Sequence, residues 1–281
     1  MDQTCLICRG RETEPLYKGL LRCRNCQYIF ADLKLTDEEL ARLYDESLFK
    51  EGEFFDYAAD RKYFEKNFRL RYKVLRRYLD SNRHRRLLEI GSAYGFFLNV
   101  VRVDFSEILG IDLTDEGVRY SREELKLPAV QGDFLQHNFD GKKFDVVCMW
   151  DTIEHVRRPD LYVEKVAELT EPGALFALTT GDIASLLARA RGQNWRMIIP
   201  PVHAHYFSSA TLTRLLENYG FEVVYNRYCG FYRSASNVAY ILLALRQQRP
   251  RAFQWLQRRG LLNWGFYLNV YDIMYVIARK R

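Results

Sequence analysis

Short apolar runs alternate with amphipathic stretches between residues 86 and 180. Five runs predict strands, because each is short and rich in apolar residues and most are followed by a glycine or an acid. They lie at residues 87–90, 108–112, 129–131, 144–150 and 174–180. Helical spacing of apolar side chains appears between them, first at residues 96–101. Near-continuous apolar strands separated by helices indicate an α/β fold whose parallel sheet is covered on both faces.

Helical patterns also precede the first strand. Residues 36–44 open with a Thr-Asp-Glu-Glu sequence that is typical of a capped helix start. Residues 54–79 place apolar side chains at helical intervals, with Arg and Lys on the other face. We therefore expect residues 35–82 to form a helical connector, and we expect its basic residues to make a solvated face.

Four cysteines lie near the N-terminus as two C-x2-C pairs separated by fourteen residues. They are Cys5, Cys8, Cys23 and Cys26. Each pair can place two thiolates on one tight turn, and four sulfurs at about 2.3 Å satisfy the tetrahedral preference of Zn²⁺. A redox role, the alternative, would need only one pair. We predict that residues 1–34 form a zinc ribbon with a structural metal.

Composition adds little that is specific. The chain has 281 residues, of which 42 are basic and 36 acidic, giving a net charge of +6. This mild charge does not by itself indicate a nucleic-acid partner, although it suits an anionic, nucleotide-linked substrate. No apolar run follows Met1, and no stretch approaches the roughly 20 apolar residues of a membrane helix. We therefore expect a cytoplasmic protein with reduced thiols, in which six cysteines indicate metal binding or catalysis.

Three strand ends carry residues suited to a nucleotide-like cofactor. Residues 89–95 (Glu-Ile-Gly-Ser-Ala-Tyr-Gly) form a glycine-containing turn before a helix, whose unpaired N–H groups can meet an anionic group. Asp112 ends the second strand, where a carboxylate can accept hydrogen bonds from a ribose diol. Both features also fit a nicotinamide-dinucleotide fold. Asp133 at the third strand end can take an adenine amino group, with Phe134 or its backbone beside the ring.

The order of these motifs resembles the class I S-adenosylmethionine-dependent methyltransferases. The matching segments are residues 89–95, 110–112, 132–134, 145–156 and 172–175. The likeness covers roughly residues 60–225, and it reaches the C-terminus if residues 271–279 form the last strand. It implies a Rossmann-like, mostly parallel seven-stranded sheet with helices on both faces over residues 83–281, and S-adenosylmethionine as cofactor.

By this resemblance, the turn around Gly91 would hold the methionine part of the cofactor, with Glu89 supporting it. Asp112 would bind the ribose, and Asp133 and Phe134 the adenine. The full set of expected cofactor residues is Glu89, Gly91, Ser92, Ala93, Gly95, Asp112, Leu113, Asp133, Phe134 and Trp150. Ala93 departs from the family, which often has glycine there; one added methyl is expected to alter the loop's shape rather than abolish binding.

The overall plan also resembles some bacterial sugar C-methyltransferases, whose N-terminal modules look similar to residues 5–26. Those enzymes carry a larger C-terminal domain than this chain. Other methyltransferases of polysaccharide and natural-product pathways fit as well. The expected acceptor is a small molecule, a sugar or a secondary metabolite, methylated at a hydroxyl or a carbon. Whether oxygen, nitrogen or carbon is methylated stays open at this stage, as does the oligomeric state.

Three histidines are candidates for a general base, because methyl transfer to oxygen requires proton removal. His155 follows the fourth strand at the expected cofactor edge; its alternative role is structural. His203 and His205 alternate in an extended segment before a helix at residues 211–218, so they are expected to point in opposite directions. A metal at these histidines is disfavoured, since no third ligand lies nearby in the sequence.

Residues 231–267 predict a helical insertion that is rich in Arg, Trp and Tyr. A basic aromatic helix pair can rest on a membrane surface, cover a substrate pocket or form a dimer contact. We favour a lid or a core element.

Two other functions are compatible with the pattern. A nucleic-acid methyltransferase would use the zinc module and the Arg-rich helices as grips. It is disfavoured because the zinc spacer lacks a dense basic run, and because no Asn-Pro-Pro-Tyr-type strand end is present. A cofactor-binding protein without catalysis is the third possibility.

Overall fold

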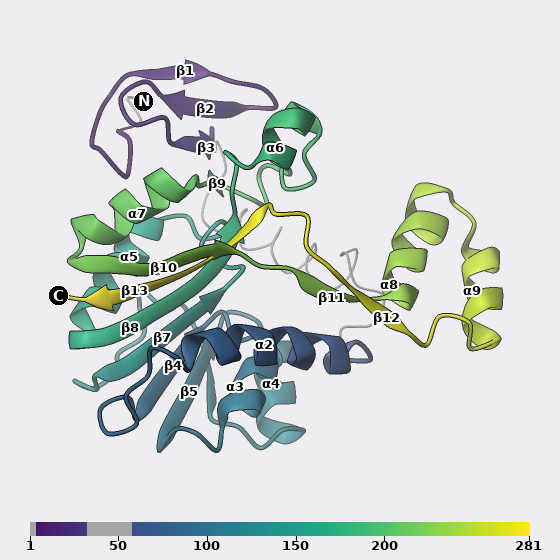
Figure 1. The fold of residues 1–281 in the computed structure, drawn as a ribbon, viewed down its shortest axis with the longest axis horizontal. Helices are drawn as coiled ribbons and strands as arrows, with labels where there is room; N and C mark the ends of the chain where they lie inside the picture. Colours follow the sequence, from purple (N-terminus) through teal and green to yellow (C-terminus); the bar gives the residue numbers. More distant parts are fainter. Residues whose placement is uncertain (1–3, 33–57) are drawn as a thin grey trace.

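The computed structural model describes residues 4–32 and 58–281, and a seven-stranded sheet forms its centre (Figure 1). The strand order is β10-β13-β8-β7-β4-β5-β6. These strands are β4 (Arg86–Ile90), β5 (Glu107–Asp112), β6 (Ala129–Gln131), β7 (Phe144–Trp150), β8 (Thr170–Gly181), β10 (Phe221–Tyr228) and β13 (Ile273–Lys280). Neighbours from β8 to β6 are parallel, whereas β13 is antiparallel to both β8 and β10. The predicted mostly parallel α/β sheet is confirmed.

Helices cover both faces of this sheet (Figure 1). On one face lie α2 (Arg61–Leu75), α3 (Phe96–Val101) and α4 (Asp115–Glu123), and on the other α5 (Pro159–Glu168) and α7 (Ser209–Asn218). Neighbouring strand residues enter different cores: Leu87 packs with α2 and α3, and Leu88 packs with α7. This alternation follows from the two-residue period of a strand. It explains why the β4 sequence reads as continuously apolar.

The helix α2 occupies part of the predicted connector. It spans Arg61–Leu75, so it is shorter than the predicted helix at residues 54–79. The predicted helix at residues 36–44 lies outside the described residues. Arg71 corrects the expectation of a solvated basic face, because its side chain is only 5% exposed.

The N-terminal module is a small antiparallel sheet. Its strands are β1 (Thr13–Pro15), β2 (Leu20–Cys23) and β3 (Ile29–Ala31), and β3 pairs with β9 (His205–Tyr206) of the larger domain. Tyr28 and Phe30 belong to the same apolar cluster as Leu88 of the central sheet. The module is therefore joined to the larger domain by a shared sheet and a shared core.

Residues 231–268 form an arm that projects away from the sheet (Figure 1). It contains β11 (Phe231–Ser234), α8 (Ala235–Ala239), the π-helical segment η2 (Tyr240–Arg246), α9 (Pro250–Arg258) and β12 (Gly265–Leu268). Trp255 and Trp264 are both more than half exposed, so the interpretation of this insertion as a core element is wrong. Between β8 and β9, α6 (Leu186–Arg191) and the 3-10 turn η1 (Gly192–Asn194) pack beside the module. Within the described residues, none of the helices combines the length and the apolar character that crossing a bilayer requires.

Candidate active site

Three strand ends meet at one edge of the sheet. Ile90 of β4 pairs with Ile111 of β5 and with Met149 of β7. The next residue of each strand or turn therefore lies beside its neighbours at the carboxyl edge, where open α/β sheets bind ligands. These residues are Gly91, Asp112 and Trp150.

The turn after β4 needs glycine for two reasons. Gly91 has a φ of +73°, and Gly95, which caps α3, has a φ of +72°. A Cβ atom at Gly91 would lie 2.6 Å from Oγ1 of Thr152, which is closer than real side chains approach. Ala93 also has a positive φ, +43°, in the position where the family often has glycine. The turn is thus a tight cradle against the segment that follows β7.

Glu89 lies beneath this turn with its carboxyl group buried. Burial raises the pKa of Glu89 well above its usual value, and the nearby Asp112 carboxylate raises it further. Its Oε2 atom and the Ser92 hydroxyl have no hydrogen-bond partner in the part of the chain that the structure describes. Buried polar atoms normally have hydrogen-bond partners, so these two atoms can form hydrogen bonds with a ligand at the turn.

Asp112 is held in place by three hydrogen bonds. Its carboxylate accepts from the Ala93 amide at 2.7 Å, and from the amide and hydroxyl of Thr114 at 2.9 and 2.6 Å. Each carboxylate oxygen has two lone-pair sites, so the group can still accept from a ligand. The next residue, Leu113, is 54% exposed although it is apolar. Both are therefore available to a ligand at the strand end.

At the third strand end, the structure leaves one of the two roles expected for Phe134. Asp133 accepts a hydrogen bond from the Leu135 amide at 2.8 Å. The ring of Phe134 is buried against Tyr162 and Phe139, with ring centroids 5.2 and 5.9 Å away. Only the backbone of Phe134 therefore remains to contact a ligand.

Sequence reasoning missed an ion pair beside Trp150. Arg71 of α2 donates to Oδ2 of Asp151 at 2.8 Å. Its guanidinium lies against three aromatic rings, Phe68, Trp150 and Phe231, at 4.9 to 5.4 Å from their centroids. The Trp150 ring is itself buried among these groups, so it helps to position Arg71 and Asp151 at the β7 end. The sequence signal was the Asp at the strand end, but nothing in the sequence paired it with Arg71.

A buried polar cluster follows β7. One ligand atom each from Glu154, His155 and His203 lies within 4.8 Å of the other two. The two imidazole rings are 4.5 Å apart between centroids. Burial lowers the pKa of His155 to about 3 and that of His203 to about 4, so both rings are neutral at pH 7. The argument that no third ligand lies near these histidines was wrong, because Glu154 supplies one.

His205 points the opposite way, as the alternating pattern predicts. Its Nδ1 atom lies 2.6 Å from the Tyr28 hydroxyl, and its Nε2 atom lies 3.3 Å from the Arg157 carbonyl. Both ring nitrogens are thus engaged within the protein, at the junction with the N-terminal module.

The four module cysteines come together as the sequence predicts. The Sγ atoms of Cys5 and Cys26 are 3.6 Å apart, and those of Cys8 and Cys23 are 3.5 Å apart. All four sulfurs lie within 4.8 Å of one another. Each C-x2-C pair is followed by a residue with a positive φ, Arg9 or Gln27, so the two turns have matching geometry. Four sulfurs at about 2.3 Å from one Zn²⁺ would be about 3.8 Å apart, close to the spacing found here.

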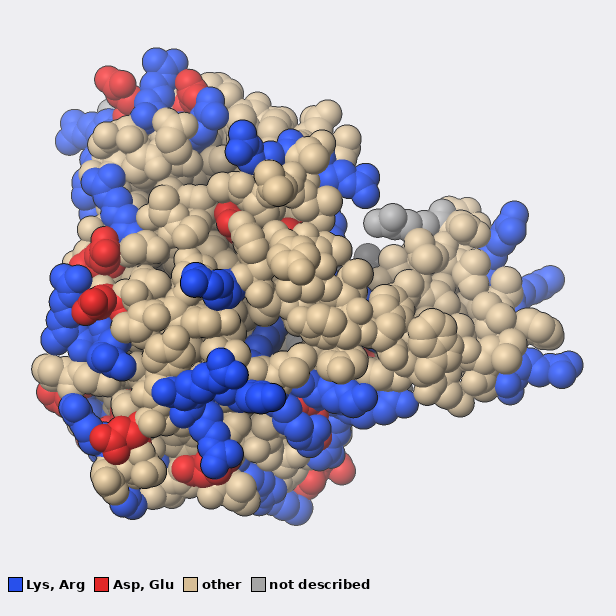
Figure 2. Space-filling view, viewed as in Figure 1, with Lys and Arg blue, Asp and Glu red and all other residues tan. Residues whose placement is uncertain are grey.

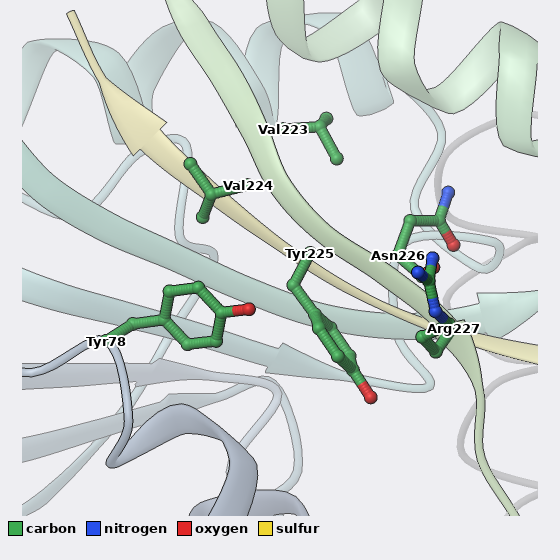
Figure 3. Close-up of a pocket in the computed structure, with 6 residues that line it drawn as sticks. All are labelled: Tyr78, Val223, Val224, Tyr225, Asn226 and Arg227. Atoms are coloured by element: carbon green, nitrogen blue, oxygen red, sulfur yellow. The ribbon is translucent and has the colours of Figure 1, made fainter.

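A separate hollow of about 510 Å³ lies on β10 (Figure 3). It is lined by Tyr78 and residues 223–227, and the rings of Tyr78 and Tyr225 are 6.0 Å apart. None of the strand-end residues borders it, so it is distinct from the candidate active site.

A family model described as a methyltransferase domain matches residues 57–226. The chain belongs to this methyltransferase family. Its fold is similar to those of solved methyltransferase structures. A putative methyltransferase from Bacillus halodurans superposes with a TM-score of 0.52 at 14% identity, covering 75% of this chain and 98% of that one. A magnesium protoporphyrin IX methyltransferase from Synechocystis, solved with bound S-adenosylhomocysteine, gives a TM-score of 0.50 at 12% identity, covering 76% and 83%.

Curated relatives of this methyltransferase are similar over part of their length. A ubiquinone biosynthesis O-methyltransferase from Chelativorans is 27% identical over 100 residues, which are 34% of this chain and 40% of the relative. One from Azoarcus is 23% identical over 152 residues, or 50% of this chain and 65% of the relative. The chain thus spans about half the length of the curated relatives it matches.

The family and the fold indicate S-adenosylmethionine as the methyl donor of this class I methyltransferase. The described residues fit such a cofactor. The unpartnered Oε2 of Glu89 and the Gly91 cradle lie at the same sheet edge as the exposed Leu113. An adenosyl amino acid requires hydrogen-bonding groups, a backbone that approaches it closely and an apolar surface for its base, and this edge of the sheet offers all three.

Proposed function

We propose that this methyltransferase transfers a methyl group from S-adenosylmethionine to a hydroxyl group of a small-molecule acceptor. The observation that carries this proposal is the meeting of three strand ends, with Glu89, Asp112 and the Gly91 turn at one edge and a buried His–Glu cluster directly beyond β7. An oxygen acceptor agrees with the O-methyltransferase names of the curated relatives. The expected acceptor classes remain a sugar, a nucleotide-linked sugar or a secondary metabolite.

The cofactor residues have separate roles in this proposal. The Gly91 turn and Glu89 hold the amino-acid part, Asp112 accepts from the ribose hydroxyls, and Asp133 takes the adenine amino group. Leu113 offers its exposed side chain to the flat face of the adenine. When bound, S-adenosylmethionine supplies a methyl carbon that its positive sulfur already activates. The protein must mainly align the acceptor with that carbon.

His155 and His203 are proposed to orient the acceptor hydroxyl. A neutral imidazole can accept a hydrogen bond from a hydroxyl group, and both rings are held by backbone carbonyls. A base is most efficient when its pKa lies near the working pH. The lowered pKa values of both rings therefore favour orientation of the hydroxyl over complete proton removal by either histidine.

The four-cysteine cluster is proposed to hold a structural Zn²⁺. Four thiolates satisfy the ion completely, and a closed site leaves no position for a substrate. The module would then act as a rigid cap on the α5 and α7 face of the domain.

Nucleic-acid binding gains no support from the charge distribution. Figure 2 shows Lys and Arg gathered over α2 and at the far end of the arm, with Asp and Glu among them over the body. The basic band over α2 is confined to that helix, and the rest of the body carries Lys, Arg, Asp and Glu intermixed on this face. Peripheral membrane contact through the exposed Trp residues of the arm stays a prediction.

Replacing Asp112 with alanine tests the proposed function directly. A charge-assisted hydrogen bond from the ribose to the remaining lone pair of this carboxylate would be lost, and we expect affinity for S-adenosylhomocysteine to fall at least about 10-fold, since such a bond contributes about 1.5–3 kcal/mol. Isothermal titration calorimetry measures this. Asp115→Ala is the matched control, because Asp115 is an exposed carboxylate three residues along the chain. Equal affinity in both variants would contradict the ribose assignment, and no affinity in the parent protein would contradict the function.

Replacing His205 with alanine tests whether this histidine is structural. The buried Tyr28 hydroxyl would lose its partner, so we expect the free energy of unfolding to fall by about 2–3 kcal/mol. Cofactor affinity and turnover should stay near parental values at a temperature where the variant is folded. Denaturant unfolding and a labelled-methyl assay measure the two effects. A stable variant without turnover would instead support the general-base prediction for His205.

A further inference from the structure

The His–Glu cluster beyond β7 is assembled from two segments that main-chain hydrogen bonds fix together. Glu154 and His155 follow the strand, and His203 arrives from the segment before β9. The amides of Ala204 and His205 both donate to the Glu154 carbonyl, at 2.9 and 3.1 Å. The three side chains are therefore brought together by the backbone and do not depend on bonding to one another.

Both histidines are oriented in the way that metal-binding histidines are. Nδ1 of His155 lies 3.0 Å from the Val202 carbonyl, and Nδ1 of His203 lies 2.9 Å from the Met197 carbonyl. A carbonyl can only accept, so Nδ1 carries the proton and the lone pair of each neutral ring is on Nε2. Metal-binding histidines usually donate their second ring N–H to a carbonyl or a carboxylate in this manner.

Glu154 provides the second, independent observation. Its side chain is 2% exposed, and neither carboxylate oxygen has a hydrogen-bond partner among residues 4–32 and 58–281. The nearby Arg71 is already paired with Asp151 at 2.8 Å. Burying a carboxylate without a partner is costly, and a buried acid is normally paired or binds a metal. The cluster thus has two buried carboxyl oxygens that are not used within the described residues.

We propose that Glu154, His155 and His203 form a binding site for a divalent first-row transition cation, separate from the four-cysteine cluster. Two imidazole nitrogens and one carboxylate oxygen suit manganese, iron or zinc, whereas magnesium and calcium prefer oxygen ligands alone. Three protein ligands leave coordination positions open. Glu154 and His155 follow β7, whose carboxyl end belongs to the candidate active site.

The use of this site in catalysis rests on the proposed methyl transfer to a hydroxyl group. A cation bound to Nε2 of His155 and of His203 would replace their direct hydrogen bonds to that hydroxyl, and it would lower the hydroxyl pKa so that the proton passes to water. The acceptor oxygen then forms the bond to the methyl carbon, and the carbon–sulfur bond breaks with its electron pair going to sulfur. The products are the methyl ether, a neutral thioether and a solvated proton. No oxidant or reductant is needed.

Titration of the full-length protein with Mn²⁺ alone, followed by electron paramagnetic resonance of the free ion, tests the site. Mn²⁺ is chosen because four thiolates bind it poorly compared with Zn²⁺, so the cysteine cluster does not compete. We expect one bound equivalent in the parent protein. His203→Ala and Glu154→Gln should each weaken Mn²⁺ binding at least about 10-fold, since loss of even an outer-shell partner costs 10- to 100-fold. His84→Asn is the matched control, because His84 lies before β4 at the opposite edge of the sheet.

Thermal unfolding separates loss of the site from loss of the fold. Glu154→Gln replaces a buried carboxyl group by an amide of nearly the same shape, so the metal-free variant should be about as stable as the parent, and Mn²⁺ should raise the melting temperature of the parent only. Unchanged Mn²⁺ binding in both variants, or no binding by the parent, would overturn the proposal. S-adenosylhomocysteine calorimetry on the same samples keeps the two proposals apart. Cofactor binding without Mn²⁺ binding rejects this site alone, whereas Mn²⁺ binding without cofactor binding rejects the methyltransferase function and leaves the site standing.

Discussion

Replacing Cys23 with serine is expected to remove the zinc that we propose for the N-terminal module and to destabilise the protein on the order of 5 kcal/mol, because binding of a structural zinc contributes about 10–16 kcal/mol to folding in small modules. The Cys23 side chain is fully buried, and its sulfur lies 3.5 Å from that of Cys8. The module keeps part of its stability from Tyr28 and Phe30, which pack into the shared core, so the loss should be smaller than the whole metal contribution. Elemental analysis and denaturant unfolding measure the two quantities.

Cys229→Ser is the control for this experiment. Cys229 lies outside the module, near Arg71, and belongs to no metal-ligand cluster found in the described residues. Its replacement should leave the zinc content unchanged. If the Cys23 variant kept as much zinc as the control, the cysteine cluster would not be the zinc site. Zinc that instead depended on His203 would point to the cluster beyond β7.

The central sheet could be predicted because its strands are specified locally. Residues 144–150 are buried on both faces in β7, so the run is continuously apolar and ends where the chain leaves the sheet. The acids that follow such runs, Asp112 and Asp133, could be assigned to one edge because parallel strands place their carboxyl ends together. The cap of α7 at Ser208 is also specified locally, because a capping box involves residues only three apart.

The parts that could not be predicted depend on contacts between distant segments. Arg71 and Asp151 are 80 residues apart, and only the packing of α2 over the sheet turns an apparently solvated arginine into a buried ion pair. Tyr28 and His205 are 177 residues apart, and their contact exists because β9 completes the sheet of the module. Glu154 was visible beside His155, but its role depends on the backbone bonds that bring His203 to it. The local pattern of apolar and polar residues carries no information about contacts between segments that are distant in the sequence.

The second large effect is expected at the turn after β4. Gly91→Ala should lower affinity for S-adenosylhomocysteine at least about 100-fold and destabilise the protein by about 3 kcal/mol. The backbone term is about 1–2 kcal/mol, because the φ of +73° is unfavourable for a residue with a Cβ atom. The remainder comes from the overlap with Thr152, whose Oγ1 and Cγ2 atoms would lie 2.6 and 2.8 Å from the new methyl group. Thr152 is β-branched and donates to the Trp150 carbonyl at 2.9 Å, so it cannot move away without giving up that bond.

Gly141→Ala separates these two contributions. Gly141 has nearly the same φ, +74°, but no described atom lies within 4 Å of an added Cβ, and the residue precedes β7, at the edge opposite the carboxyl ends of the parallel strands. In this variant the free energy of unfolding should fall only by the backbone contribution of about 1–2 kcal/mol. It should bind S-adenosylhomocysteine with parental affinity in calorimetry. Because the two substitutions carry equal backbone strain, any difference between them in cofactor affinity reports the geometry of the β4 turn. Parental affinity in the Gly91 variant would mean that the cofactor does not approach this backbone, and the roles proposed for Glu89 and Asp112 would then have to be abandoned with it.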